Sequence, residues 1–161
     1  KIERLLSEDG MGRMMELLHN YVLNVAIVSW VSAQILKTLL YLVIRKKFEP
    51  ERLVGAGGMP SAHSATVCGL MIAISRHSGF TSPEFAIAFV LAAVVMYDAM
   101  GVRRAAGEQA KVLNKIIEKH SENENNDFDR QAELKEYLGH TPLQVLAGGL
   151  LGILVAMILP M

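Results

Sequence analysis

Cysteine is almost absent from this sequence of 161 residues, and neither sign of charge is in excess. The single cysteine, Cys68, excludes an intramolecular disulfide framework and a cysteine-rich metal site. The 16 Lys and Arg residues balance the 16 Asp and Glu residues, so we expect no nucleic-acid partner. Hydrophobic residues make up 52% of the chain, which excludes disorder over most of it. A compact helical soluble domain and a small membrane protein both fit this composition.

Charge is also nearly missing from four long segments, and this layout decides between the two classes. The segments are Tyr21–Ile44, whose one charge is Lys37, and the uncharged Ser61–Ser75, Phe85–Tyr97 and Thr141–Met161. A membrane-spanning helix needs about 20 apolar residues, which the first and last segments supply. The two central segments are shorter, and a buried helical hairpin in a soluble core is the alternative interpretation for them. Four such segments in one chain favour a polytopic membrane protein.

The predicted fold is all-α, a membrane helical bundle with about four transmembrane helices. The segments are rich in Leu, Ala, Met and Ile and lack the period-two alternation of membrane strands. Gly148 and Gly152, four residues apart, would let two helices approach closely in lipid. We expect one membrane-embedded domain over residues 1–161, with an N-terminal polar segment (1–18) and a helical loop (101–140).

Basic residues gather on one predicted side of the membrane. Arg45 begins a basic loop after the first segment, residues 101–140 hold seven Lys and Arg, and the turn between the central segments has only Arg76. By the positive-inside rule both basic loops face the cytoplasm. We therefore expect an integral protein of the cytoplasmic (plasma) membrane, surrounded by membrane lipids, with its site facing the cytoplasm.

A glycine-rich string precedes the second segment and ends in Pro60-Ser61-Ala62-His63. Ser61 suits the N-cap of the helix that follows, and a helix N-terminus is a natural phosphate site because unpaired N–H groups and the positive dipole end meet there. His63, in the first turn, can donate a proton near neutral pH. The alternative is a capped helix with an interfacial histidine.

Four cations are candidates for holding the phosphate: Lys37, Arg45, Arg103 and Arg104. An ionisable residue at the depth of Lys37 marks a functional site by default, and snorkelling to the interface is the alternative. Arg103 and Arg104 suit bidentate phosphate binding, but adjacent arginines also serve as simple cytoplasmic anchors.

A second histidine, His140, begins the fourth segment, and Gln144 follows four residues later. This spacing lets the Gln144 amide accept a hydrogen bond from the imidazole and fix its tautomer, although an interfacial His near a helix start explains the pair equally well. Two histidines and several cations without a carboxylate cluster suit phosphoryl chemistry that needs no metal or other cofactor.

The strings GGMPSAHSA, DAMGVRRAAGEQA and LGHTPLQVLAGGLLG resemble the divergent branch of the type 2 phosphatidic acid phosphatase superfamily, which is related to vanadium-dependent haloperoxidases. The resemblance extends from about Val25 to the end of the chain. It implies a phosphatidic acid phosphatase-like bundle in which His140 is the nucleophile and His63 protonates the leaving group. It also implies that Lys37 and Arg45 bind phosphate.

The sequence departs from the superfamily at several of these positions. Seven residues separate Lys37 from Arg45 instead of six, and Lys135 or the Arg103–Arg104 pair stands in for an arginine expected before His140. Gln144 occupies the position of the Asp that orients the nucleophile. The set of expected site residues is therefore catalytic His140, His63 and Gln144, with phosphate bound by Lys37, Arg45, Ser61, Arg103, Arg104 and Lys135.

Two functions follow from this resemblance. The first is a lipid phosphatase (hydrolase) that cleaves a lipid phosphate or pyrophosphate through a phosphohistidine. The second is a non-catalytic protein that binds or transports phospholipids or isoprenoid phosphates and retains the pocket without the chemistry. A phosphorylated lipid is the expected partner in both. Because about four spans are fewer than the six usual in the superfamily, we also expect a homodimer.

Overall fold

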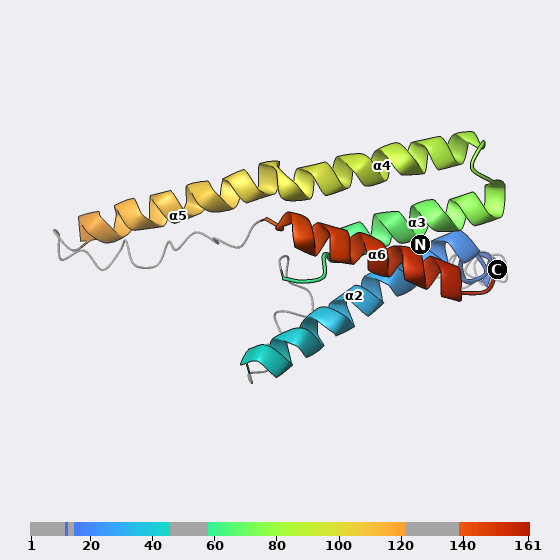
Figure 1. Ribbon diagram of the computed structural model, residues 1–161, viewed down its shortest axis with the longest axis horizontal. Coiled ribbons are helices and arrows are strands. Elements are labelled where there is room, and N and C mark those ends of the chain that lie inside the picture. The colour runs from blue at the N-terminus through green and yellow to red at the C-terminus, as the bar shows by residue number, and fades with distance from the viewer. Residues whose placement is uncertain (1–11, 13–14, 46–57, 122–138) are drawn as a thin grey trace.

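The computed structural model describes residues 12, 15–45, 58–121 and 139–161 (Figure 1). Its helices are α2 (Tyr21–Arg45), α3 (Ala62–Ser78), α4 (Pro83–Met100), α5 (Val102–Ser121) and α6 (Pro142–Ile158). Three helices of the bundle begin where the sequence offers a cap or a proline. Hydroxyl groups cap α3, α4 and α6 at Ser61, Ser82 and Thr141, and Pro83 and Pro142 open the latter two helices.

Helix α3 is the centre of the bundle and packs against α2, α4 and α6. It runs parallel to α6: its N-cap residue forms a hydrogen bond with the first turn of α6, and its last turn forms one with the C-terminal end of α6. The two backbones approach closely at Gly148 and Gly152, where an added Cβ would overlap the backbone of α3 and of its N-cap. The predicted role of this glycine pair in close helix packing is confirmed.

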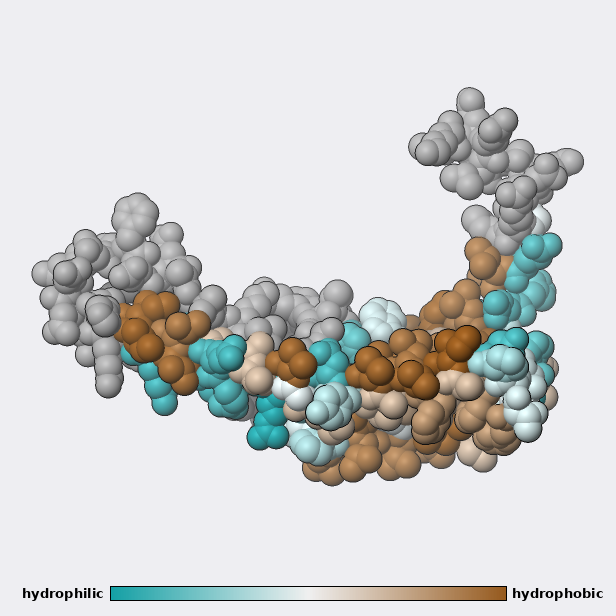
Figure 2. All heavy atoms as spheres, turned by 90° about the horizontal axis from the view of Figure 1, so that it is seen from above, coloured by the Kyte–Doolittle hydropathy of each residue, from teal (hydrophilic) through white to brown (hydrophobic). Residues whose placement is uncertain are grey.

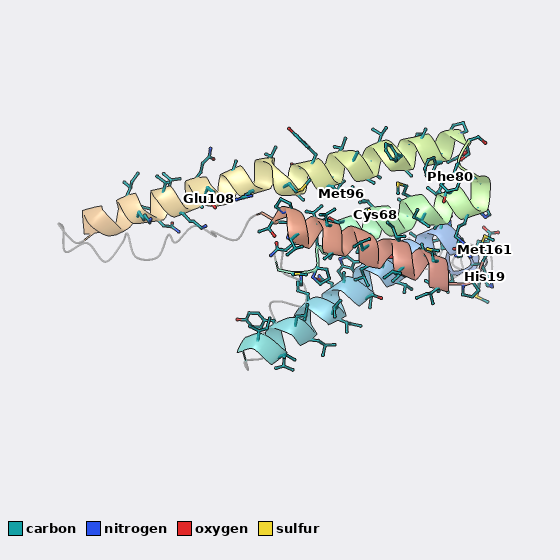
Figure 3. The ribbon with its side chains drawn as sticks, viewed as in Figure 1. His19, Cys68, Phe80, Met96, Glu108 and Met161 are labelled. Atoms are coloured by element: carbon teal, nitrogen blue, oxygen red, sulfur yellow. The ribbon has the colours of Figure 1, made fainter. Side chains whose placement is uncertain are left out.

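Helices α2 and α4 run antiparallel to α3. Along α2, Val25 packs with Ala73 near the end of α3, whereas Ala33 packs with Ala62 at its start. On the other side of α3, Cys68 contacts Met96 of α4, with 3.7 Å between the two sulfur atoms (Figure 3). The C-terminal ends of α2 and α4 therefore lie at the same end of the bundle as the N-terminal ends of α3 and α6.

Small residues fill the interior of the bundle and large apolar residues cover its outside. Among the buried apolar residues alanine predominates, including Ala33, Ala65, Ala88 and Ala156. Large side chains are exposed on α2, α4 and α6, and Figure 2 shows apolar side chains spread over the bundle. In lipid, helices associate through small residues, while large apolar residues face the acyl chains. The distribution is that of a membrane protein.

Two helices are long and apolar enough to cross a membrane: Tyr21–Ile44 and the continuous Pro83–Ile117. The helix Pro142–Ile158 is apolar but shorter. Ile87 and Val94 of α4 are 70% and 60% exposed, so α4 is not a buried helix of a soluble core. Helix α3 is largely buried between α2, α4 and α6.

The expected helical loop over 101–140 is helical from its start. Helix α5 follows α4 after the single residue Gly101 and extends beyond the bundle as a continuation of the same rod (Figure 1). On its surface, Glu108 and Lys111 form an exposed ion pair at 3.2 Å. Residues 122–138 of the expected loop, and most of the segment 1–18, lie outside the described residues.

Candidate functional site

His140 and Gln144 form the first half of the candidate site, at the start of α6. Nδ1 of His140 lies 3.2 Å from Oε1 of Gln144, the hydrogen bond that their spacing predicts. His140 itself precedes the helix, since Thr141 is the N-cap. Its backbone N–H donates to the carbonyl of Ala99 at the end of α4, and the residue is only 6% exposed. The histidine is therefore held from two sides.

A capping box fixes the tautomer of His140. The backbone N–H of Thr141 donates to Oε1 of Gln144 at 3.0 Å, while the hydroxyl of Thr141 accepts from the Gln144 N–H. Because this N–H holds the amide oxygen toward the cap, the imidazole must donate to the same oxygen from Nδ1. Nε2 then keeps its lone pair, which is the form a histidine nucleophile needs.

His63 and Ser61 form the second half of the site, at the start of α3. Ser61 is fully buried, and its hydroxyl accepts from the backbone N–H and the hydroxyl of Ser64. The predicted N-cap is confirmed. The Ser61 N–H donates to the carbonyl of Gln144 at 3.0 Å, so the N-terminal ends of α3 and α6 are joined directly. His63 is exposed in the first turn of α3.

The fold brings the two histidines together although they are far apart in the chain. The ring centroids of His63 and His140 are 6.4 Å apart, and the ring planes are tilted by 56°. The N-terminal ends of both α3 and α6 lie at this point, each carrying the positive end of a helix dipole. A negatively charged ligand between the rings would be stabilised by both helices.

Lys37 lies against the loop that leads into this site. The residue is 5% exposed, and a Cβ added at Gly58 would lie 3.2 Å from its Cδ. Gly58 has a φ of 85°, a conformation in which glycine is free of the penalty that other residues carry. Lys37 is thus covered by protein, and the snorkelling interpretation does not describe it.

The start of α5 packs on the residue before His140. A Cβ at Gly139 would overlap the backbone of Arg104, so only glycine allows this approach. Arg104 is exposed beside the His140 segment. The side chains of Arg45 and Arg103, and Lys135 as a whole, lie outside the described part, and their predicted phosphate contacts stay predictions.

Three residues that contribute to this geometry were not among the predicted site residues. Thr141 orients the Gln144 amide, Gly139 admits the first turn of α5, and Gly148 admits the carbonyl of Ser61. The Thr-x-x-Gln pattern is a recognisable capping-box signal in the sequence, whereas both glycine contacts depend on pairings that no local pattern indicates. In the described ranges, no group of three or more His, Cys, Asp or Glu residues could hold a metal ion.

Comparisons with known proteins support the membrane class. Residues 18–155 match the model of the Divergent PAP2 family. The chain is also 40% identical over 153 residues to a Bacillus subtilis (strain 168) protein named "Uncharacterized membrane protein YuiD", a match that covers 90% of this chain and 97% of the relative. No solved structure matches significantly. The relative's name and the two long apolar helices both support a membrane protein.

Proposed function

We propose that this chain, which belongs to the Divergent PAP2 family, is a membrane phosphatase that hydrolyses a lipid phosphate or pyrophosphate. One observation carries the proposal: the His63 and His140 rings lie close together at the joined N-terminal ends of two helices. General acid–base and nucleophilic catalysis both require groups that can reach the same reacting atom. The helix dipoles supply the positive potential that a phosphoryl group needs.

In the proposed first step, Nε2 of His140 attacks the phosphorus atom. A nitrogen–phosphorus bond forms while the bond from phosphorus to the leaving oxygen breaks, and His63 gives its proton to that oxygen. Gln144 keeps the attacking nitrogen unprotonated by holding the proton on Nδ1. In the second step, water attacks phosphorus, His63 takes a proton from the water, and His140 leaves with its electron pair restored.

The cations would hold the equatorial oxygens of the phosphoryl group during both steps. Lys37 and Arg104 are the described candidates, and the support for them is their contact with Gly58 and Gly139, which shortly precede Ser61 and His140 in the chain. The proposal assigns Arg45, Arg103 and Lys135 to the same task by resemblance, and Ser61 to shaping the loop. Planar guanidinium groups suit the oxygens of phosphate because they can bind two at once.

The proposed topology has four spans, α2, α3, α4 and α6, with the site at the cytoplasmic face of the plasma membrane. The packing supports this alternation, because α3 and α6 begin at the site end of the bundle and α2 and α4 finish there. Arg45, the last residue of α2, and Arg103 and Arg104, in the first turn of α5, are at this end, as the positive-inside rule expects. A homodimer would extend so small a bundle.

A second candidate function is a non-catalytic protein that binds or transports phospholipids or isoprenoid phosphates. Gln144 favours it, because a neutral amide accepts the Nδ1 hydrogen bond without stabilising an imidazolium by charge. In serine proteases, which are unrelated enzymes, neutralising the Asp that orients the catalytic histidine lowers kcat by about 10⁴. Binding would survive such a loss.

Phosphate release from phosphatidate and from a polyprenyl pyrophosphate tests the proposal, with the purified full chain in mild detergent. We expect release by the wild-type protein and none by His140→Ala. Binding of phosphatidate without release, retained in His140→Gln and lost in Arg104→Ala, would support the second function. Release that is equal in wild type and His140→Ala would contradict the phosphatase proposal.

A further inference from the structure

Two buried polar atoms on α2 have no hydrogen-bond partner within the described structure: Oγ of Ser29 and Oε1 of Gln34. Ser29 is fully buried and Gln34 is 7% exposed. A buried acceptor without a donor destabilises the fold, so each such atom calls for an explanation.

Helix packing explains Ser29. Its side chain lies directly against Gly69 of α3, where an added Cβ would overlap Oγ. A small residue at this place lets the two helix backbones approach, as is usual between helices in lipid. Ser29 therefore acts as a spacer between α2 and α3.

Packing does not explain Gln34, whose long carboxamide side chain is more than a spacer needs. Gln34, Lys37 and Tyr41 are spaced i, i+3 and i+7, so they form one polar stripe along α2. The stripe runs toward the C-terminal end of α2, and Lys37 within it packs against the Gly58 loop. Such a stripe on a mostly apolar helix is expected to face a site and not lipid.

The neighbouring residue Ala33 places Gln34 along the axis of the bundle. Ala33 packs with Ala62 and Ala65, which flank His63 in the first turns of α3. Gln34 thus lies level with the first turn of α3, one helical turn deeper in the membrane than Lys37. Its unpartnered oxygen is therefore buried near the end of the bundle that holds His63 and Lys37.

We propose that Gln34 is a binding residue of the same site, whose Oε1 accepts a hydrogen bond from the P–OH of a singly protonated phosphate. The proposal rests on the proposed function, because it places its ligand at the His63–His140 site. The second pKa of a phosphate monoester is about 6, so a P–OH donor is available close to neutral pH. Sulfate carries no proton there and offers only acceptors.

This difference gives the residue a specificity role. Lys37 and the helix dipoles attract any oxyanion through charge. A carboxamide oxygen favours an anion that can donate to it, and it forms no hydrogen bond with an anion that presents only oxygen lone pairs. Gln34 would therefore make the site prefer phosphate over sulfate, whether the phosphate is free or part of a lipid headgroup.

Calorimetric titration of the full chain tests the proposal. Inorganic phosphate and sulfate are titrated into the protein in mild detergent, and phosphatidate binding is measured in lipid nanodiscs. Gln34→Met keeps the side-chain length and removes the acceptor. We expect it to weaken phosphate and phosphatidate binding about tenfold and to leave sulfate binding unchanged. Gln34→Asn, which withdraws the amide by one methylene, should give the same selective loss if the Met variant does not fold. Ser29→Ala is the matched control and should match wild type for all three ligands.

Equal phosphate affinity in wild type and folded Gln34→Met would overturn the inference and leave the proposed function intact. Equal loss for sulfate and phosphate would also overturn it, since charge alone would then explain binding. A loss confined to phosphatidate would assign Gln34 to another part of the lipid and contradict the shared P–OH contact. A selective loss in a protein that releases no phosphate would support the inference and contradict the phosphatase. Absence of all phosphate binding in wild type would contradict both.

Discussion

A basic side chain lies at each end of α3, but the two lie beside opposite ends of helices: Arg76 beside the C-terminal end of α6, and Lys37 beside the loop that leads into the N-terminal end of α3. At the C-terminal end of α3, Nη1 of Arg76 donates to the carbonyls of Ala156 and Leu159, where α6 ends, and to the hydroxyl of Tyr21. Figure 3 shows this end of the bundle beside the labelled Met161 and His19. At the N-terminal end, Lys37 lies against the loop before α3.

This contrast indicates a different role for each end. Carbonyl groups at a helix C-terminus attract a cation, so Arg76 completes the electrostatics of its end and forms a static joint. The ends of α3 and α6 at the other side present N–H groups, which repel a cation and attract an anion. Lys37 and Arg104 add positive charge to a place that is already positive. The proposed function uses this end to bind an anion.

The largest expected effect is on catalysis at the N-terminal end. His63→Ala removes the proposed acid and should lower turnover of phosphatidate about 100-fold or more. Its effect on a polyprenyl pyrophosphate should be smaller, because phosphate leaves more readily than an alkoxide. Initial rates of phosphate release measure both. His77→Ala, at the other end of the same helix, should retain wild-type rates, and an equal loss in the two variants would remove the distinction between the ends.

Arg76→Met should act on stability and leave the site alone. The change leaves the carbonyls of Ala156 and Leu159 without their charged donor, at a cost of about 2 kcal/mol in the free energy of unfolding. Thermal melting in mild detergent should show a lower Tm than for wild type or for His77→Ala. Phosphatidate affinity at low temperature should be unchanged, and a weakened affinity with an unchanged Tm would refute the static role.

Gln144→Glu adds a negative charge beside His140, at the N-terminal end of α6. A carboxylate can replace the amide oxygen in the capping box and also stabilise an imidazolium, so turnover should rise about tenfold. Gln144→Leu removes both hydrogen bonds and should lower turnover. The ratio of kcat values decides the matter, and a Glu variant less active than wild type would show that the neutral amide is required.

The smallest effect is expected away from both ends. Lys111→Ala breaks the exposed ion pair with Glu108 on α5 and should change the unfolding free energy by less than about 0.5 kcal/mol. Neither phosphatidate binding nor turnover should change, as a binding isotherm and a rate assay can show. A clear loss of binding would mean that the site extends along α5 well beyond Arg104.

Features set by neighbours along the chain could be predicted from the sequence. The His140–Gln144 bond follows from a spacing of four residues, and Ser61 is a capping residue just before an apolar helix. The charge layout predicts the membrane class because bilayer thickness sets the length of an apolar segment. The family follows from the same local strings, and the match over residues 18–155 confirms it.

Features set by packing between helices could not be predicted. The burial of Lys37 depends on the loop at Gly58, and the continuation of α4 into α5 depends on one residue, Gly101, which the sequence presents as a helix end. Gln34 was not predicted as a site residue, because a single amide in an apolar segment is ordinary until its oxygen is found without a donor. Contacts between residues distant in the chain decide the burial of Lys37 and the environment of Gln34.

A structure of the full chain with vanadate bound is a more direct test than a rate of phosphate release of whether His63 and His140 face one anion. Vanadate mimics a phosphoryl group in transfer. We therefore expect vanadium to be bonded to Nε2 of His140, with a vanadate oxygen within hydrogen-bond distance of His63. Vanadate bound away from these two rings, or a site that stays empty at saturating vanadate, would contradict it.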